Sequence, residues 1–201
     1  MPTYKAPVED VNFLLNDVFQ IDRYNNLPGF ADATADMVEA IVGGIGEFAE
    51  SEFAPLNRIG DMVGARLVDG KVIMPDGFPE AYRHYVANGW GSINAPAEFG
   101  GQGLPFSLAT VALDSLGAAN MAFALCPILS VGAIEAINHH GNDKQKATFL
   151  PHLSTGAWTG TMNLTEPQAG SDVGALRTTA TPIPEGPHAG KYHIAGTKIF
   201  I

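Results

Sequence analysis

The 201-residue sequence contains one cysteine, Cys126, and has only 11 lysines and arginines against 21 aspartates and glutamates. A single cysteine excludes an internal disulfide and any zinc site built from several cysteines. Its apolar neighbours, Ala-Leu before it and Pro after it, favour a small buried thiol over a reactive one. The formal net charge is −10 and the basic residues form no stripe. The many phosphate contacts of non-specific nucleic-acid binding are therefore excluded.

Long uninterrupted apolar runs are also scarce. The most hydrophobic stretch, residues 116–137, contains Asn120, Pro127, Ser130 and Glu135, which makes a membrane span a poor fit. Two buried helices that meet at Pro127 are favoured instead. The first ten residues have neither the apolar core of a signal peptide nor an arginine-rich pattern, so we expect no targeting segment and a cytoplasmic protein.

Helical periodicity dominates the first 155 residues. Thr34 is a plausible N-cap, Gly89 a natural residue to follow a helix end, and Asn142 or Asp143 a cap for the last helix. Pro55 is expected to end the second helix. A loop or a short extended excursion is expected over residues 60–77. The expected helices cover residues 9–21, 34–53, 78–88, 105–119, 121–140 and 143–153.

The pattern changes near residue 156. Residues 158–164 alternate imperfectly, and residues 175–183 and 191–201 are rich in Thr, Ile, Tyr and Phe, which is typical of strands. The fold class is therefore α+β, with helices first and strands after. The last segment stops at Ile201 inside an expected strand, which would leave an open sheet edge. We therefore expect a fragment, or a chain that needs another polypeptide to finish its second domain.

Residues 162–172, Met-Asn-Leu-Thr-Glu-Pro-Gln-Ala-Gly-Ser-Asp, stand out as the end of an expected strand followed by a tight loop, in which Pro167 disfavours helix at Glu166. Gly170 permits a positive φ or the close approach of a ligand to the backbone. Ser171 and Asp172 are good N-cap residues, and free N–H groups there can cradle an anion. Judged by residue type alone, an ordinary capped turn is the favoured interpretation.

Five segments together resemble a known family. Thr-Glu-Pro-Gln-Ala-Gly-Ser-Asp at 165–172, followed by Gly-Thr-Lys-Ile-Phe-Ile at 196–201, resembles the signature of acyl-CoA dehydrogenases. Phe-Gly-Gly-Gln-Gly at 99–103, the segment 141–153 and Gly-Ala-Trp-Thr-Gly at 156–160 resemble further family motifs in the same order. Segments near Tyr4 and Leu27 resemble the branch with long polypeptides, which includes 3-methylmercaptopropionyl-CoA dehydrogenase-like enzymes.

The resemblance implies an N-terminal extension at 1–35, an all-α helical domain at 36–155 and the first strands of an antiparallel β-barrel middle domain at 156–201. It also implies FAD as cofactor, an acyl-CoA substrate, an electron-carrier flavoprotein as partner and a homo-oligomer. The implied reaction is α,β-desaturation of the thioester, by abstraction of the α proton and hydride transfer to flavin N5. An acyl-CoA oxidase-like flavoenzyme and a non-catalytic interaction module of the same fold remain alternatives.

The resemblance further implies individual roles. Met162 and Leu164 would face the isoalloxazine, and Thr165 would hydrogen-bond its polar edge. Ser171 would meet the pyrophosphate or the pantetheine of CoA, which makes it a substrate-binding residue as well. Phe200 stands at a position where many members carry Trp. The implied cofactor-binding residues are Met162, Leu164, Thr165, Gly170, Ser171 and Phe200.

The resemblance implies no catalytic residue within this chain. The catalytic base of the family is a carboxylate of the C-terminal helical domain, and it has no match here, so it is expected beyond Ile201. Glu166, despite its place in the motif, is expected to be structural. The isolated chain is therefore expected to be inactive.

Overall fold

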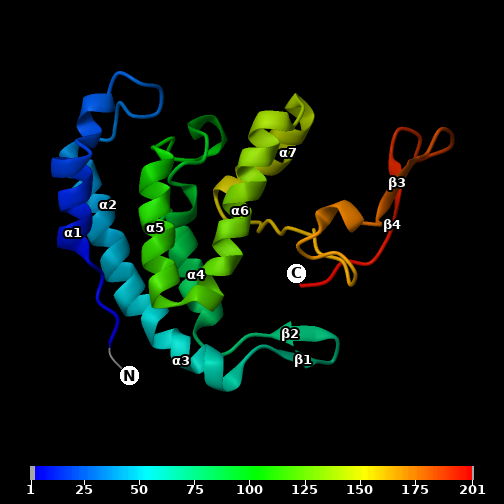
Figure 1. The fold of residues 1–201 in the computed structure, drawn as a ribbon, viewed down its shortest axis with the longest axis horizontal. Helices are drawn as coiled ribbons and strands as arrows, with labels where there is room; N and C mark the ends of the chain where they lie inside the picture. Colours follow the sequence, from blue (N-terminus) through cyan, green and yellow to red (C-terminus); the bar gives the residue numbers. More distant parts are fainter. Residues whose placement is uncertain (1–2, 201) are drawn as a thin grey trace. The chain divides into compact units, whose positions relative to one another are not determined.

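The computed structural model describes residues 3–200, and the chain forms two compact units that divide after Gly160 (Figure 1). We call residues 3–160 the helical unit and residues 161–200 the C-terminal unit. The helical unit contains α1 Val8–Asn12, α2 Ala35–Phe48, α3 Ala54–Val63, β1 Arg66–Val68, β2 Lys71–Ile73, α4 Phe78–Ala87, α5 Phe106–Ala119, α6 Met121–His140 and α7 Asp143–Ser154. The C-terminal unit contains β3 Thr179–Pro182 and β4 Tyr192–Ala195. The expected α+β class, with helices first and antiparallel strands after, is confirmed.

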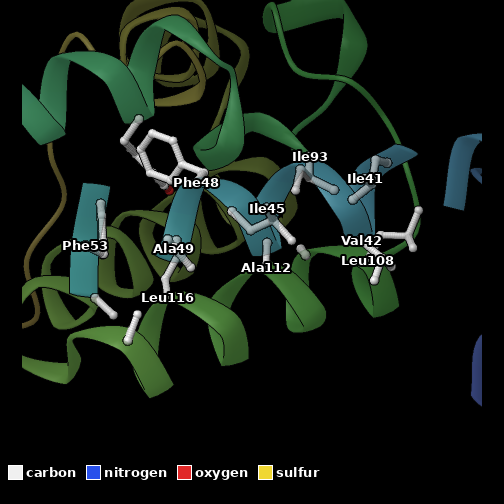
Figure 2. Packing of buried hydrophobic residues seen from close by; sticks show 14 of the residues in the cluster. Ile41, Val42, Ile45, Phe48, Ala49, Phe53, Ile93, Leu108, Ala112 and Leu116 are labelled. Carbon is white, nitrogen blue, oxygen red and sulfur yellow. The ribbon is translucent and has the colours of Figure 1, made fainter. Parts of the chain in front are cut away.

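The core of the helical unit lies between α2 and α5. The neighbouring helices are α2 and α5, α5 and α6, and α6 and α7. Apolar side chains at helical spacing on α2 face a matching row on α5 (Figure 2). Phe53 is fully buried and packs against Phe123 with the two rings tilted by 44° and 4.1 Å between ring centroids. The facing residues are Ile41, Val42 and Ile45 on α2 and Leu108, Ala112 and Leu116 on α5.

The helix does not end at Pro55, so that expectation was wrong. A π-helical turn, Ala49–Phe53, joins α2 to α3, and Pro55 lies in the first turn of α3. Proline is tolerated in the first turn of a helix, and the wider π-helical turn ends just before Pro55. The turn also brings Ala49 and Phe53 into the core. A local sequence rule predicts a helix end at this proline, because it takes no account of the tertiary packing that stabilises the helix on both sides of it.

Several predicted helix boundaries are confirmed. The Thr34 hydroxyl accepts a hydrogen bond from the Met37 N–H at 3.3 Å. Asn142 and Gln145 form a reciprocal capping box in which both hydrogen bonds are 2.9 Å. Gly89 follows α4 with a φ of 72°, the left-handed conformation that glycine adopts most easily.

The helix α6 runs unbroken through Pro127, so the expected pair of helices meeting there was wrong. Contacts with α5 and α7 on its flanks hold α6 together and offset the roughly 3 kcal/mol that an internal proline costs. Cys126 is exposed rather than buried, because Phe123, Ala124 and Pro127 take the inward positions. By length and composition alone α6 could cross a membrane, since its most apolar window has a mean hydropathy of 1.7. Core helices pass the same test, so this is weak support for a span.

Residues 60–77 include the extended excursion that the sequence indicated. Helix α3 continues to Val63, and β1 and β2 then form an antiparallel hairpin in which Arg66 pairs with Ile73. All six strand residues are exposed. This hairpin leaves the helices as a separate projection of the helical unit (Figure 1).

The C-terminal unit contains one antiparallel hairpin, β3–β4, in which Thr179 pairs with Ala195 and Pro182 with Tyr192. The strand expected at 158–164 does not form, and the two expected at 175–183 and 191–201 are shorter than predicted over the residues that the structure describes. A strand needs a partner along its length. Residues 158–165 and 196–200 are joined by a single backbone bond, from the Ile199 N–H to the Thr165 carbonyl at 3.0 Å. Ile201, the last residue of the expected strand, lies outside the described residues.

Candidate functional site

A tight turn anchors the Thr-Glu-Pro segment of the C-terminal unit. The Glu166 N–H donates to the Ala169 carbonyl, and the Ala169 N–H donates back to Glu166, each at 3.0 Å. Both residues point inward, with exposed fractions of 3% for Glu166 and 1% for Ala169. Pro167 and Gln168 form the exposed tip of this turn. The turn is thus closed by its backbone and held by two buried side chains.

The Glu166 carboxylate accepts four hydrogen bonds. The backbone N–H groups of Arg177 and Thr178 donate at 2.8 and 3.0 Å. The Gln168 amide donates at 2.6 Å and the Lys198 ammonium at 2.9 Å. Each carboxylate oxygen therefore has two donors, and the acceptor capacity of the group is well used.

This environment decides the chemistry of Glu166. Hydrogen bonding from Thr178, from the Lys198 ammonium and from the Arg177 N–H holds the pKa of the Glu166 carboxyl well below its usual range. The Thr178 hydroxyl is itself buried without a partner at full hydrogen-bond geometry, so we assign the Thr178 contribution to its backbone N–H. A carboxylate this weakly basic and this fully engaged is a poor proton acceptor. The structural role expected for Glu166 is therefore supported.

The catalytic base is a separate question from the role of Glu166. It was expected beyond Ile201, and Ile201 itself lies outside the residues that the structure describes. The structure therefore places neither Ile201 nor a base that follows it. A base beyond Ile201 stays a prediction, and the motif carboxylate of Glu166 does not replace it.

Lys198 links the two halves of the signature. Its ammonium donates both to Glu166 and to the Leu164 carbonyl, each at 2.9 Å. The neighbouring Ile199 N–H donates to the Thr165 carbonyl. We call these five residues, Leu164, Thr165, Glu166, Lys198 and Ile199, the Glu166–Lys198 joint. It brings together segments that are more than thirty residues apart in the chain.

The predicted cofactor-binding side chains lie around this joint and mostly on its outside. Met162, Leu164 and Phe200 have exposed fractions of 59, 39 and 88%. Thr165 is half-buried, and Gly170 and Ser171 are exposed. Gly170 has a negative or extended φ, and a Cβ added there would meet nothing within 4 Å. Nothing in the C-terminal unit itself therefore requires glycine at this position, and cofactor contact by these six residues stays a prediction.

The available groups fit a flavin nucleotide in chemical type. Among residues 3–200, the hydroxyls of Thr165 and Ser171 make no hydrogen bond to another residue, so both remain available to a ligand. Exposed Met, Leu and Phe side chains offer the apolar surface that the ring system of a flavin prefers. Hydroxyl donors together with apolar slabs match a group with a flat apolar ring and a polar edge.

The Phe99–Gly103 motif lies in the helical unit and serves backbone packing. The Gln102 N–H donates to Ser92 and the Gly103 N–H to Ala95, each at 2.9 Å. Gly101 lies so close to Ala95 that an added Cβ would be 2.0 Å from the Ala95 carbonyl oxygen. This glycine permits the two loop segments to touch.

Sequence reasoning overlooked Lys198. Its signal was present, because Lys198 is the one charged residue in an otherwise apolar or neutral segment, residues 192–200 apart from His193. A lysine among apolar residues needs either a buried partner for its charge or a position at the surface. In the part of the chain that the structure describes, no cluster of three or more His, Cys, Asp or Glu side chains could hold a metal ion.

Comparison with known proteins identifies close relatives. Residues 37–157 match the family model described as "Acyl-CoA dehydrogenase, N-terminal domain". The chain is 45% identical over 199 residues to 3-methylmercaptopropionyl-CoA dehydrogenase of Ruegeria pomeroyi, covering 99% of this chain and 33% of that protein. The chain therefore spans about a third of the length of this curated relative.

Solved structures agree with the sequence match. The acyl-CoA dehydrogenase complexed with FAD from Bacillus anthracis has a TM-score of 0.67 at 26% identity, covering 84% of this chain and 26% of that chain. Butyryl-CoA dehydrogenase from Megasphaera elsdenii has a TM-score of 0.68 at 25% identity, covering 82% of this chain and 40% of that chain. Both structures contain a region with the same fold as this chain.

Proposed function

Because this chain belongs to the acyl-CoA dehydrogenase family, we propose that it supplies the N-terminal helical domain and part of the flavin site of an FAD-dependent acyl-CoA dehydrogenase. The reaction is α,β-desaturation of an acyl-CoA thioester. An electron-carrier flavoprotein as the oxidising partner and a homo-oligomeric assembly belong to the same proposal. The observation that carries it is the Glu166–Lys198 joint, which gathers the exposed apolar and hydroxyl groups of both signature segments.

Each proposed site residue has a role suited to its chemistry. Bound FAD would supply the hydride acceptor. The Thr165 hydroxyl would donate to the polar edge of the ring and stabilise negative charge there. Phe200, Met162 and Leu164 would form an apolar surface that excludes water and holds the ring plane. Phe200 lacks an indole N–H, so it contributes packing alone.

The backbone after the tight turn would hold a phosphate-bearing group. Gly170 and Ser171 are exposed, and the Ser171 hydroxyl and nearby N–H groups would bind the pyrophosphate of FAD or the pantetheine of CoA. Glu166 is committed to its four hydrogen bonds, so we assign the abstraction of the α proton to a carboxylate beyond Ile201. Acyl-chain preference likewise has no residue assigned to it.

Thr165→Val tests the proposal. The change keeps the β-branched shape and removes the hydroxyl, and loss of one hydrogen bond to the flavin should weaken FAD binding about fivefold to tenfold. FAD affinity, measured by quenching of flavin fluorescence, and the visible spectrum of the bound flavin are the two readouts, with full-length protein throughout. Thr181→Val, an exposed position on β3, is the matched control.

The outcomes separate the alternatives. Unchanged FAD affinity and spectrum in Thr165→Val would refute the placement of this loop at the flavin. Rapid reaction of the reduced flavin with oxygen would favour an oxidase-like enzyme. Absence of FAD binding by the full-length protein would favour a non-catalytic interaction module.

A further inference from the structure

Glu166 and Lys198 form a largely buried ion pair whose function the proposed chemistry does not explain. Glu166 has a side-chain exposure of 3% and Lys198 of 21%, and the charged atoms are 2.9 Å apart. Neither charged group is free to act on a substrate, because each is bound to other groups of the chain. Replacing a buried ion pair with apolar residues is often neutral or stabilising for a fold. Stability alone is therefore a weak reason for this pair.

Geometric specificity is a stronger reason. The Lys198 ammonium reaches the Glu166 carboxylate and the Leu164 carbonyl together, so it contacts the chain on both sides of Thr165. The Ile199 N–H then binds the Thr165 carbonyl itself. Three hydrogen bonds thus fix the alignment of residues 198–199 against residues 164–166.

This alignment controls which side chain is presented. Phe200 directly follows the aligned residues 198–199 with a φ of 60°, and its side chain is 88% exposed, whereas that of Ile199 is half-buried. A slip of one residue would bring the half-buried Ile199 to the place of Phe200 and displace the Phe200 side chain from the position that the alignment gives it. An ion pair with several hydrogen bonds resists such a slip more than apolar packing does, because a shifted register leaves a buried charge without its partner.

We propose that Glu166 and Lys198 are the positioning residues of the flavin site, which hold Thr165 and Phe200 in the one alignment that lets both face the same bound flavin. This inference rests on the proposed function. In this inference Lys198 acts by positioning Thr165 and Phe200, and it takes no direct part in the chemistry. A merely structural pair would stabilise the C-terminal unit and leave the site of the folded molecules unchanged.

The experiment compares three lysine variants of the full-length protein. Lys198→Met keeps the aliphatic stem and removes the ammonium, whereas Lys198→Arg restores a cation with several donors. Lys191→Met removes an exposed ammonium from the same unit and serves as the control. The readouts are FAD affinity, the visible spectrum of bound flavin, and hydrogen exchange of the Ile199 amide.

We expect Lys198→Met to weaken FAD binding about tenfold or more, as loss of a charge-assisted contact does, with a shifted flavin spectrum and faster exchange at Ile199. Lys198→Arg should recover most of the affinity and the original spectrum. Lys191→Met should behave as the wild type does. Glu166→Gln, which removes the charge from the other side, should shift the flavin spectrum in the same way as Lys198→Met.

Each other outcome is a refutation. If the wild-type protein binds no FAD, the proposed function and this inference are both wrong. If the wild type binds FAD and Lys198→Met matches it in affinity and spectrum, the inference alone is wrong. If Lys198→Met lowers only the folded fraction, and its folded molecules bind flavin with the wild-type spectrum, the pair is structural and the inference is again wrong.

Discussion

Replacing Gly101 with alanine gives a sharp test of the loop packing in the helical unit. An added Cβ would lie 2.0 Å from the Ala95 carbonyl oxygen, 2.3 Å from its carbon and 2.6 Å from the Ala95 Cβ. Carbon atoms in good contact are about 3.5 Å or more apart, so one of the two backbones must move by about 1 Å. Ala95 has an exposed fraction of 1%, and its surroundings leave it little room to move.

The size of the effect follows from what that movement disturbs. Overpacking a tight site costs about 1–3 kcal/mol. Displacing the Ala95 carbonyl also breaks its 2.9 Å hydrogen bond from the Gly103 N–H, which is worth about 1 kcal/mol. Gly101→Ala should therefore lower the free energy of local opening by about 2–4 kcal/mol. That difference corresponds to exchange of the Gly103 amide about thirtyfold to seven-hundredfold faster than in the wild type.

Native-state hydrogen exchange of the Gly103 and Leu104 amides measures this directly. Gly132→Ala is the matched control, because a Cβ at this position inside α6 would meet nothing within 4 Å. Alanine is favoured over glycine in a helix by up to about 1 kcal/mol, so this control should stabilise the helical unit slightly. Exchange at Gly103 that is within threefold of the wild type in Gly101→Ala would show that the two loop segments are not packed as described.

Two further predictions concern buried polar groups. Asn120 is 1% exposed, accepts a hydrogen bond from the Phe123 N–H at 3.1 Å and donates to the Phe53 carbonyl at 3.3 Å. Asn120→Ala should therefore destabilise the helical unit by about 1–3 kcal/mol, measured by denaturant titration. A change below about 0.5 kcal/mol would contradict the capping role of Asn120. For Glu166, whose pKa is lowered on folding, the stabilising contribution is complete above the ordinary value of 4.5 and is lost as the pH falls further toward the depressed one. Protection of the Arg177 amide should accordingly decline in acid below that value, and Glu166→Gln should remove this part of the pH dependence; the same acid profile in both proteins would assign it to other groups.

Elements marked by local signals were predictable from sequence. The helix expected at 121–140 has those bounds in the structure, and that expected at 143–153 ends one residue later. Caps at Thr34 and Asn142 form because a side-chain oxygen and a nearby N–H need only a few residues to meet. Such features depend on neighbours in the chain, which a sequence displays directly.

Features that depend on distant contacts were not predictable in the same way. Pro55 signals a helix end locally, yet burial of Phe53 carries the chain through a π-helical turn and onward. Residues 158–164 alternate imperfectly, as some strands do, but strand formation requires a partner that the pattern cannot supply. The candidate site shows both situations. Its residue types were recognisable as a motif. The pairing of Glu166 with Lys198 was not, because it depends on how the segment around Lys198 folds back against a segment 32 positions earlier in the chain.

The hairpin β3–β4 is an excursion whose two ends meet at one place. It leaves at Thr178, whose backbone N–H binds Glu166, and it returns at Gly196, which lies against the Thr178 side chain. The hairpin can therefore be longer or shorter without changing the distance between its two ends. Residues 184–190 at its tip are exposed throughout. An affinity sequence or fluorescent label could be inserted there without disturbing the end of the hairpin at Thr178 and Gly196.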